Sequence, residues 1–166
     1  KSMETLAEKG YMGDSLLLNV QRITSCASFA RMSGVQLPVM TTTGSGNQGI
    51  TLILTVAATA MELGVPEEKM LRAIAFAQAI NLYAKHYLGT LSCLCSCSVA
   101  SGLSASAGIV YMMGGSDQQV LDTMRNVLGS ISGMICDGAK EGCASKVCLS
   151  TGLSVMSAMM ALNGMN

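Results

Sequence analysis

Cysteine is the residue type in this sequence that is best suited to chemistry, and six of the seven cysteines fall into two dense groups. The first group comprises Cys93, Cys95 and Cys97, the second comprises Cys136, Cys143 and Cys148, and Cys26 stands apart. Thiolates are soft ligands that suit iron–sulfur clusters or zinc. Neither group has the paired Cys-x-x-Cys spacing of a zinc ribbon, which favours a cluster ligated from distant segments over zinc. The alternative is that the cysteines are small apolar side chains packed in a helical core.

The spacing of the first group limits how many of its thiols can bind one metal. A regular helix over residues 91–113 would place Cys93 and Cys97 on one face and turn Cys95 elsewhere. One ligand from this segment and two from the loop at residues 136–143 would then give three thiolates. A [4Fe–4S] cluster held by three thiolates leaves one iron with an open position, which a Lewis-acid catalyst requires.

A second candidate site is the polar segment at residues 41–49, Thr-Thr-Thr-Gly-Ser-Gly-Asn-Gln-Gly, which leads into a predicted helix. Exposed amides, hydroxyls and the positive end of a helix make an anion site that suits a substrate carboxylate. The side chains expected to hold this carboxylate are Thr43, Ser45, Asn47 and Gln48. The segment lacks the lysine of a P-loop and follows no strand, so a nucleotide site is not supported. An ordinary turn with a helix cap is the alternative.

Two further ionisable residues stand near these motifs. Lys140 lies between Cys136 and Cys143, where a cation beside a cluster could bind an anionic substrate, or where a loop lysine simply faces water. His86 is the only histidine, so the chain offers no Ser-His-Asp triad unless this residue is the base. It lies late in a predicted helix, where a solvated histidine that complements the helix dipole is the commoner case.

Helices must position these motifs, because no alternating strand pattern is present. The predicted helices span residues 15–32, 48–63, 66–88, 91–113, 116–128 and 146–162. Their boundaries are indicated by glycines, by Pro66 in a first turn, and by a capping box that starts at Ser116. Gly, Ala, Ser and Met are abundant, which suits close packing through small side chains. The fold class is therefore all-α: one compact multi-helix domain over residues 1–166, with buried small-residue helices.

Composition excludes several classes of partner. Ten basic and ten acidic residues cancel, so no electrostatic footprint for nucleic acid is present. Three uncharged stretches, residues 32–61, 87–116 and 147–166, raise the possibility of membrane spans. The first contains Pro38 and the polar segment, the second is rich in Ser and Cys, and no aromatic belt or Lys/Arg excess brackets them. We therefore predict no membrane partner and, without an apolar signal segment, a reducing cytoplasmic location.

Several blocks of sequence carry a resemblance to a known family, in the right order over most of the chain. They are Ala-Arg-Met-Ser-Gly at residues 30–34, Pro-Val-Met at 38–40, Gly-Ser-Gly-Asn-Gln-Gly at 44–49, the Leu-Ser and cysteine block at 91–97, and Gly-Met-Ile-Cys-Asp-Gly-Ala-Lys with Gly-Cys at 133–143. The chain resembles the bacterial L-cysteine desulfidase family, which is related to the α chain of iron–sulfur L-serine dehydratases.

The resemblance implies a [4Fe–4S] cluster bound by Cys136, Cys143 and a third cysteine, which we expect to be Cys95 rather than Cys97. It implies a β-eliminating lyase that converts L-cysteine or L-serine to pyruvate and ammonia, with release of sulfide or water. In such an enzyme the segment at residues 41–49 would hold the carboxylate of a small amino-acid substrate, with Lys140 nearby.

The sequence also departs from this family. Family members are much longer, and their amino-terminal half carries a Gly-Cys-Thr-Glu-Pro-like block, with the proposed base or nucleophile, that is absent here. We therefore expect a carboxy-terminal half that is inactive alone, with its base supplied by a missing amino-terminal half or a β-type subunit, in an enzyme compatible with a homo-oligomer. The alternative function is a helical structural or regulatory domain with unliganded cysteines.

Overall fold

The computed structural model describes residues 5–6, 8–11, 13–89 and 91–165. Within these residues the chain forms helices joined by loops, with two isolated β-bridges and no sheet. The helices are α2 (Leu16–Met32), α3 (Gly46–Gly49), the π-helix η1 (Ile50–Leu54), α4 (Thr55–Glu62), α5 (Glu67–Leu88), α6 (Val99–Met112), α7 (Asp117–Ile131) and α8 (Cys143–Leu162). The predicted all-α fold is confirmed.

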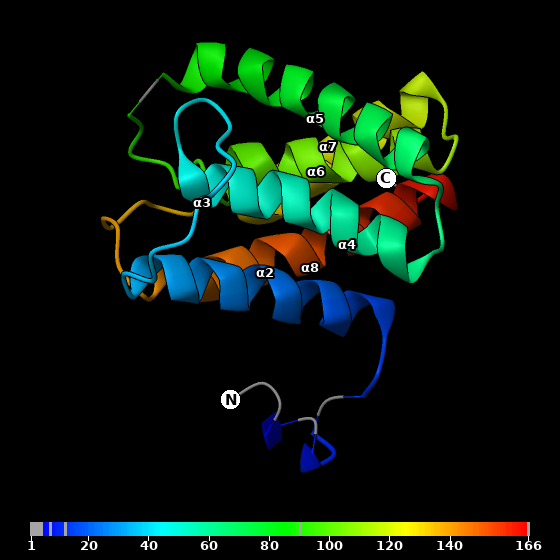
Figure 1. The fold of residues 1–166 in the computed structure, drawn as a ribbon. Coiled ribbons are helices and arrows are strands. Elements are labelled where there is room, and N and C mark those ends of the chain that lie inside the picture. The colour runs from blue at the N-terminus through cyan, green and yellow to red at the C-terminus, as the bar shows by residue number, and fades with distance from the viewer. Residues whose placement is uncertain (1–4, 7, 12, 90, 166) are drawn as a thin grey trace.

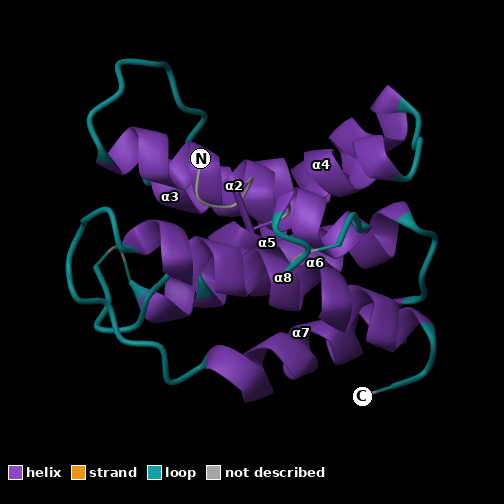
Figure 2. Cartoon of the chain, turned by 90° about the horizontal axis from the view of Figure 1, so that it is seen from below, coloured by secondary structure: helices purple, strands orange, loops and turns teal. Residues whose placement is uncertain are grey.

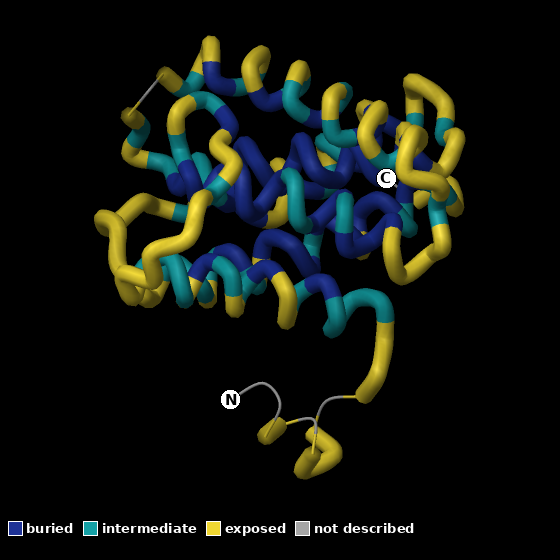
Figure 3. The backbone as a smooth tube through the Cα atoms, viewed as in Figure 1, coloured by how far each residue is buried: buried dark blue, intermediate teal, exposed yellow. Residues whose placement is uncertain are grey.

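Helix α6 forms the centre of the domain and is buried along almost its whole length (Figure 3). Helices α5, α7 and α8 pack against it, and α2 covers the outer side of α8 (Figure 1). Small side chains permit the close approach of these helices, as predicted. A Cβ atom at Gly108 of α6 would lie only 2.9 Å from the Cβ atom of Ala77 in α5. The core is therefore held by close contact between helix backbones more than by large side chains.

Local capping explains why several helices begin where the sequence predicts. The Ser15 hydroxyl accepts a hydrogen bond from the Leu18 amide at 3.3 Å at the start of α2. Ser116 and Gln119 form the predicted capping box at the start of α7. Such caps satisfy amides that have no partner inside the helix, and they depend on neighbouring residues alone.

The predicted helix at residues 48–63 is present, but it begins at Gly46 and contains the π-helical turn η1. Threonine hydroxyls line its buried side and bond to carbonyl oxygens one turn earlier, at 2.9 Å from Thr51 to Asn47 and at 2.7 Å from Thr59 to Thr55. These bonds satisfy buried hydroxyls without partners from other helices. Threonines that bond in this way also bend helices, and π-helical turns are frequent near functional sites.

The prediction of a helix over residues 91–113 is wrong in its first part, because α6 begins at Val99. The preceding residues pair instead with the loop that follows α7. The Cys95 amide donates to the Met134 carbonyl at 2.7 Å, and the Cys136 amide donates to the Cys93 carbonyl at 2.8 Å. These bonds satisfy the backbone of the cysteine-rich segment outside any helix. The helix-face argument for its three thiols therefore does not hold.

The loops that carry the candidate residues meet at one end of the bundle. Helices α2 and α5 end there, and α3, α6 and α8 begin there (left in Figure 1). Figure 2 shows the loops before α6 and α8 gathered at the same end. Helix α8 starts at Cys143, three residues before the predicted start, so Cys143 is its first residue.

Helix α8 is the one helix in the described residues that is long and apolar enough to cross a membrane. Half of its apolar window is buried inside the domain, and it packs against α2, α6 and α7. A core helix passes the same test of length and composition, so this single helix is weak support for a membrane span.

Candidate metal and substrate site

The glycine-rich loop and the cysteine-rich segment are in direct contact. The Ser45 side chain lies close enough to the Cys97 thiol to act on the pKa of that thiol, which places the loop before α3 beside the segment before α6. Ser45 also caps α3, with its hydroxyl 3.4 Å from the Gln48 amide. Two motifs that lie about fifty residues apart in the sequence therefore form one site.

Cys95 and Cys97 differ sharply in acidity. Hydrogen bonding with Cys97 is the largest cause that lowers the pKa of Cys95 to about 5, with smaller contributions from hydrogen bonding with Ser98 and from the charge of Lys146, although burial opposes this shift. The same bond to Cys95, together with burial, raises the pKa of Cys97 well above its usual range. Their interaction thus favours the charged form of Cys95 and the protonated form of Cys97. Cys95 is therefore a thiolate at neutral pH, the form that binds metals.

The second cysteine group contributes Cys136 and Cys143 to the same end of the domain. Cys136 is exposed, and its backbone is tied to Cys93 by the bond described above. Cys143 is half-buried, and its sulfur lies 3.6 Å from the Gly138 carbonyl oxygen. Cys143 is close enough to Cys97 for its charge to raise the pKa of that thiol. The structure therefore brings thiols from both groups into electrostatic range of one another.

Lys146 fixes the loop that carries Cys136. Its ammonium donates to the Ile135 carbonyl at 2.9 Å and also to the Asp137 carboxylate. Lys140, a predicted substrate-binding residue, pairs with the other oxygen of Asp137 at 2.5 Å, and its side chain is largely exposed. The two lysines hold the pKa of Asp137 well below its usual range. The Lys140 ammonium is therefore paired with Asp137 at the surface of the loop.

No group of three or more His, Cys, Asp or Glu side chains in the described part of the chain is arranged to hold a metal ion. Three such side chains would have to converge on a single metal ion, and in a zinc site the thiolates bind at about 2.3 Å. A [4Fe–4S] cluster instead takes each thiolate on a different iron and so separates its ligands more widely. Cys95 lies at the same loop-rich end of the domain as Cys136 and Cys143, and thiolates are the ligands that such a cluster takes.

The glycine-rich loop adopts a tight turn that presents hydroxyl groups. Thr43 has a positive φ of 48°, and Gly44 follows with a φ of 80°. The turn is closed by a bond of 3.0 Å from the Ser45 amide to the Thr42 carbonyl. A left-handed φ is uncommon in a β-branched residue and is found most often at functional sites. Thr43 and Ser45 remain half-buried, so a small ligand can reach their hydroxyls.

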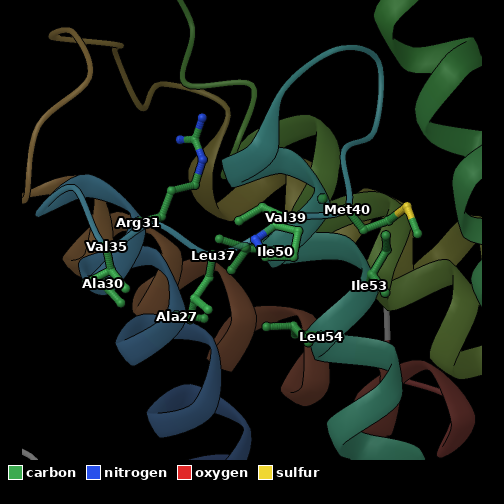
Figure 4. Close-up of a pocket in the computed structure, with 12 residues that line it drawn as sticks. Ala27, Ala30, Arg31, Val35, Leu37, Val39, Met40, Ile50, Ile53 and Leu54 are labelled. Atoms are coloured by element: carbon green, nitrogen blue, oxygen red, sulfur yellow. The ribbon is translucent and has the colours of Figure 1, made fainter.

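Asn47 and Gln48, which were predicted to bind the carboxylate, are almost completely buried, with 4% exposure each. Arg31 donates to Oδ1 of the Asn47 side chain at 3.3 Å, and the Thr43 hydroxyl donates to Oε1 of the Gln48 side chain at 3.1 Å. These contacts make the two amides braces of the loop. Arg31 extends from the end of α2 toward α3 and is also one of the residues that line an apolar cavity of about 230 Å³ between α2 and η1 (Figure 4).

Sequence analysis missed two buried polar residues of α5 that face the site. Asn81 is fully buried and lies 3.3 Å from the Thr42 hydroxyl and 3.3 Å from the Ser101 hydroxyl. Lys85, one turn later, is 8% exposed and donates to the Ser96 hydroxyl at 3.3 Å. The only sequence signal was two polar residues four positions apart on one helix, which is a common pattern on solvated faces.

Three other candidate residues lie outside the group of side chains described above. His86 is exposed and contacts the ring of Tyr87, with 5.2 Å between the centroids. Cys26 of α2 and Cys148 of α8 lie near each other on a different part of the surface, where burial raises the pKa of Cys148. They line a groove between these two helices. His86 is therefore separate from the site, and the groove of Cys26 and Cys148 adjoins it at Glu141 and Gly142, the end of the loop of Cys136.

The fold and the site define a class of protein. It is an all-helical domain in which several thiols and hydroxyl-bearing turns lie at one end. The sequence matches the serine dehydratase alpha chain family over residues 2–166, and the chain belongs to this family.

Relatives share much of this sequence. The chain is 46% identical over 156 residues to a UPF0597 protein of Alkaliphilus metalliredigens and 43% identical over 157 residues to one of Alkaliphilus oremlandii. It is 48% identical over 140 residues to a UPF0597 protein of Clostridium tetani. These matches cover 94%, 95% and 84% of this chain but only 35%, 36% and 33% of the relatives. The chain thus spans about a third of their length. No solved structure matches.

Proposed function

We propose that this chain is the cluster-bearing part of a β-eliminating lyase that converts L-cysteine or L-serine to pyruvate and ammonia, with release of sulfide or water. Membership of the serine dehydratase alpha chain family supports the reaction class. The observation that carries the proposal is the backbone pairing of the Cys93 and Cys95 segment with the loop of Cys136, which brings Cys95, with its lowered pKa, to the loop that leads to Cys143. A thiolate at neutral pH in such a group of thiols suits metal binding better than core packing.

Cys95, Cys136 and Cys143 would hold the [4Fe–4S] cluster. When bound, the cluster supplies a Lewis acid at the iron that no cysteine occupies, and this assists departure of a thiol or hydroxyl group. Cys97 would stay protonated as the hydrogen-bond donor to Cys95. Lys146 would keep the Cys136 loop in place through its bonds to Ile135 and Asp137.

The half-buried hydroxyls of Thr43 and Ser45 would face the substrate carboxylate, and Thr43 would exchange its hydrogen bond to the Gln48 side chain for one to the carboxylate. Asn47 and Gln48 would take part through the loop that they brace, rather than through side chains that are already buried and bonded. Lys140 would add positive charge at the rim of the site. This arrangement fixes the substrate at its carboxylate and turns its β-substituent toward the cysteines.

The reaction requires a base to remove the α-proton as the carbon–sulfur or carbon–oxygen bond breaks. The product, aminoacrylate, takes up water and yields pyruvate and ammonia. The histidine of this chain, His86, is exposed and lies outside the site, so it is not placed to act as this base. We assign the base to further residues of the same protein or to a β-type subunit, in a reducing cytoplasmic compartment.

A helical structural or regulatory domain is the second candidate function. The observation that favours it is the lack, within the described residues, of three metal-ligating side chains arranged around one ion. This function predicts that the cysteines stay unliganded and that the protein releases no pyruvate from either amino acid.

Turnover by a full-length relative and by this chain separates these functions. Both proteins would be reconstituted anaerobically with iron and sulfide and assayed for pyruvate from L-cysteine and L-serine. We expect the relative to turn over these substrates. This chain should turn them over more slowly by a factor of about 10² or more, since a general base contributes that much. Cys136→Ser should abolish turnover, whereas Cys26→Ser should not. A relative that releases no pyruvate from either substrate would contradict the proposal.

A further inference from the structure

Arg31 reaches from the last turn of α2 to the glycine-rich loop. Its guanidinium atoms Nε, Cζ and Nη2 lie 2.4, 2.8 and 3.0 Å from the position that a Cβ atom would take at Gly46. Figure 4 shows this side chain extending from the end of α2 toward α3. Any side chain at residue 46 would displace the guanidinium, so the glycine leaves a seat for it against the backbone of the loop.

Asn47 fixes the orientation of this guanidinium. Its Oδ1 accepts a hydrogen bond of 3.3 Å from Nη1 of Arg31, and its Nδ2 donates to Sδ of Met32 at 3.3 Å. Because the amide nitrogen is bonded to the sulfur, the carboxamide keeps its oxygen turned toward the arginine. Asn47 is almost completely buried, so it acts on Arg31 and not directly on a ligand.

Arg31 differs from the other cations near the site in its partners. A guanidinium carries five N–H donors in a planar fork, and the acceptor at Nη1 is a neutral amide. Among the residues that the structure describes, no carboxylate forms an ion pair with Arg31, whereas Lys140 and Lys146 both pair with Asp137. Arg31 is half-buried, so a small solute can reach it. Its remaining donors and its charge suit a carboxylate, which a guanidinium binds through two parallel hydrogen bonds.

The seat of the guanidinium adjoins the hydroxyl groups and the cysteine-rich segment. Ser45 directly precedes Gly46 in the chain and is half-buried. Its side chain lies close to the Cys97 thiol, at the junction of the two loops. A small anion bound to Arg31 at Gly46 would therefore lie beside the Ser45 hydroxyl, on the loop that faces the cysteines.

We propose that Arg31 binds the α-carboxylate of the substrate through two hydrogen bonds and restricts the site to amino acids with a free carboxylate. This inference rests on the proposed function and deepens it. The Ser45 hydroxyl would complete the carboxylate site, and Asn47 would position the guanidinium. Amides and esters, which lack the negative charge, are then excluded from productive binding. Arg31 acts in binding and orientation, and it transfers no proton.

The test compares L-serine with L-serinamide, which differ in the charge of the carboxyl group and little in shape. Binding of each to the anaerobically reconstituted chain would be measured by isothermal titration calorimetry. We expect the chain to prefer L-serine by at least roughly tenfold, as for a charge-assisted hydrogen bond. Arg31→Met should abolish this preference, and Arg31→Lys, which keeps the charge but loses the planar fork, should retain part of it. Arg22→Met, at an exposed position of the same helix, is the matched control and should keep the full preference.

A measurement on the unsubstituted chain covers the case in which Arg31→Met fails to fold. Phenylglyoxal modifies accessible arginines, and mass spectrometry of the peptides reports the rate at each one. L-serine should slow the modification of Arg31 and not that of Arg22, and L-serinamide should slow neither.

The outcomes separate this inference from the proposed function. If the chain binds L-serine, and Arg31→Met folds and keeps the preference or L-serine leaves Arg31 unprotected, Arg31 is a structural residue and the inference is overturned while the proposed function stands. If the chain takes up a cluster but binds neither L-serine nor L-cysteine, the assignment of the substrate fails, and the inference falls with it. Protection by L-serine and L-serinamide alike would show that the carboxylate charge is not what Arg31 recognises.

Discussion

The thiols of Cys95 and Cys97 interact with each other, and this interaction makes two cysteines that are separated by one residue unequal in acidity. Cys95 holds the negative charge, with Ser98 Oγ at 3.5 Å from its sulfur and Lys146 supplying positive charge. Cys97 keeps the proton in contact with Ser45. The pair thus offers one ready thiolate at the junction of the two loops, and it singles out Cys95 as the ligand that we assign to this segment.

The acidity of Cys95 is directly measurable in the cluster-free, reduced chain. Because the pKa of Cys95 is lowered to about 5, its thiol should lose its proton as pH rises through 5 and stay ionised at neutral pH. The Cβ chemical shift of Cys95, followed by NMR, should titrate with this midpoint. Cys97→Ala removes the main cause and should move the midpoint up to about 8.5 or higher, the ordinary range for cysteine. A midpoint near the ordinary value in the unsubstituted chain would contradict the assigned hydrogen bond.

Gly49 permits the close approach of the glycine-rich loop to the start of the helical segment. A Cβ atom there would lie 1.9 Å from the Met40 carbonyl oxygen, and backbone atoms cannot move aside as a flexible side chain can. Gly49→Ala should therefore lower the free energy of unfolding by about 3 kcal/mol or more, the upper range for overpacking. Gly129→Ala in α7 is the control, since nothing lies within 4 Å of its Cβ position. It should raise stability by about 0.5–1 kcal/mol.

Urea unfolding followed by circular dichroism measures both free energies. The two substitutions add the same methyl group and should change the free energy of unfolding in opposite directions. Equal effects at the two positions would mean that the loop near Met40 is not packed as described.

The loop of Cys136 should depend on Lys146 more than on Lys140. Lys146 bonds to both a backbone carbonyl and Asp137, and it is partly buried, whereas Lys140 bonds to Asp137 alone and is exposed. Lys146→Met should therefore weaken retention of iron on dilution, while Lys140→Met, an equal loss of charge, should have a smaller effect. Iron content after anaerobic gel filtration measures both. A larger loss of iron from Lys140→Met than from Lys146→Met would show that the exposed lysine, Lys140, holds the Cys136 loop in place.

Sequence features that act over a few residues predicted the helices well. The capping box at Ser116 and the cap at Ser15 depend on neighbours within the same turn, so composition and spacing located α2 and α7 correctly. The cysteine-rich segment failed as a helix because its backbone partners, such as the Cys136 amide, lie some forty residues away. Ser and Cys have no strong preference that would have revealed this pairing.

The candidate site was predictable as two motifs and not as one constellation. The spacing of the cysteines and glycines identified both loops, but the contact of Ser45 with Cys97 follows from the packing of α2, α5 and α6. Lys85 was hidden because its burial depends on which face of α5 covers the domain. Gln48 looked like a ligand by residue type, yet its side chain faces inward and is bonded to Thr43.

Anaerobic reconstitution of this chain with iron and sulfide tests the central claim most directly. The chain should take up about four iron and four sulfide per molecule and show visible cluster absorbance. Cys95→Ser, Cys136→Ser and Cys143→Ser should each remove most of this iron, whereas Cys26→Ser and Cys148→Ser, away from the site, should leave it bound. Failure of the chain to bind iron, or loss of iron that does not distinguish these two sets of cysteines, would contradict the account.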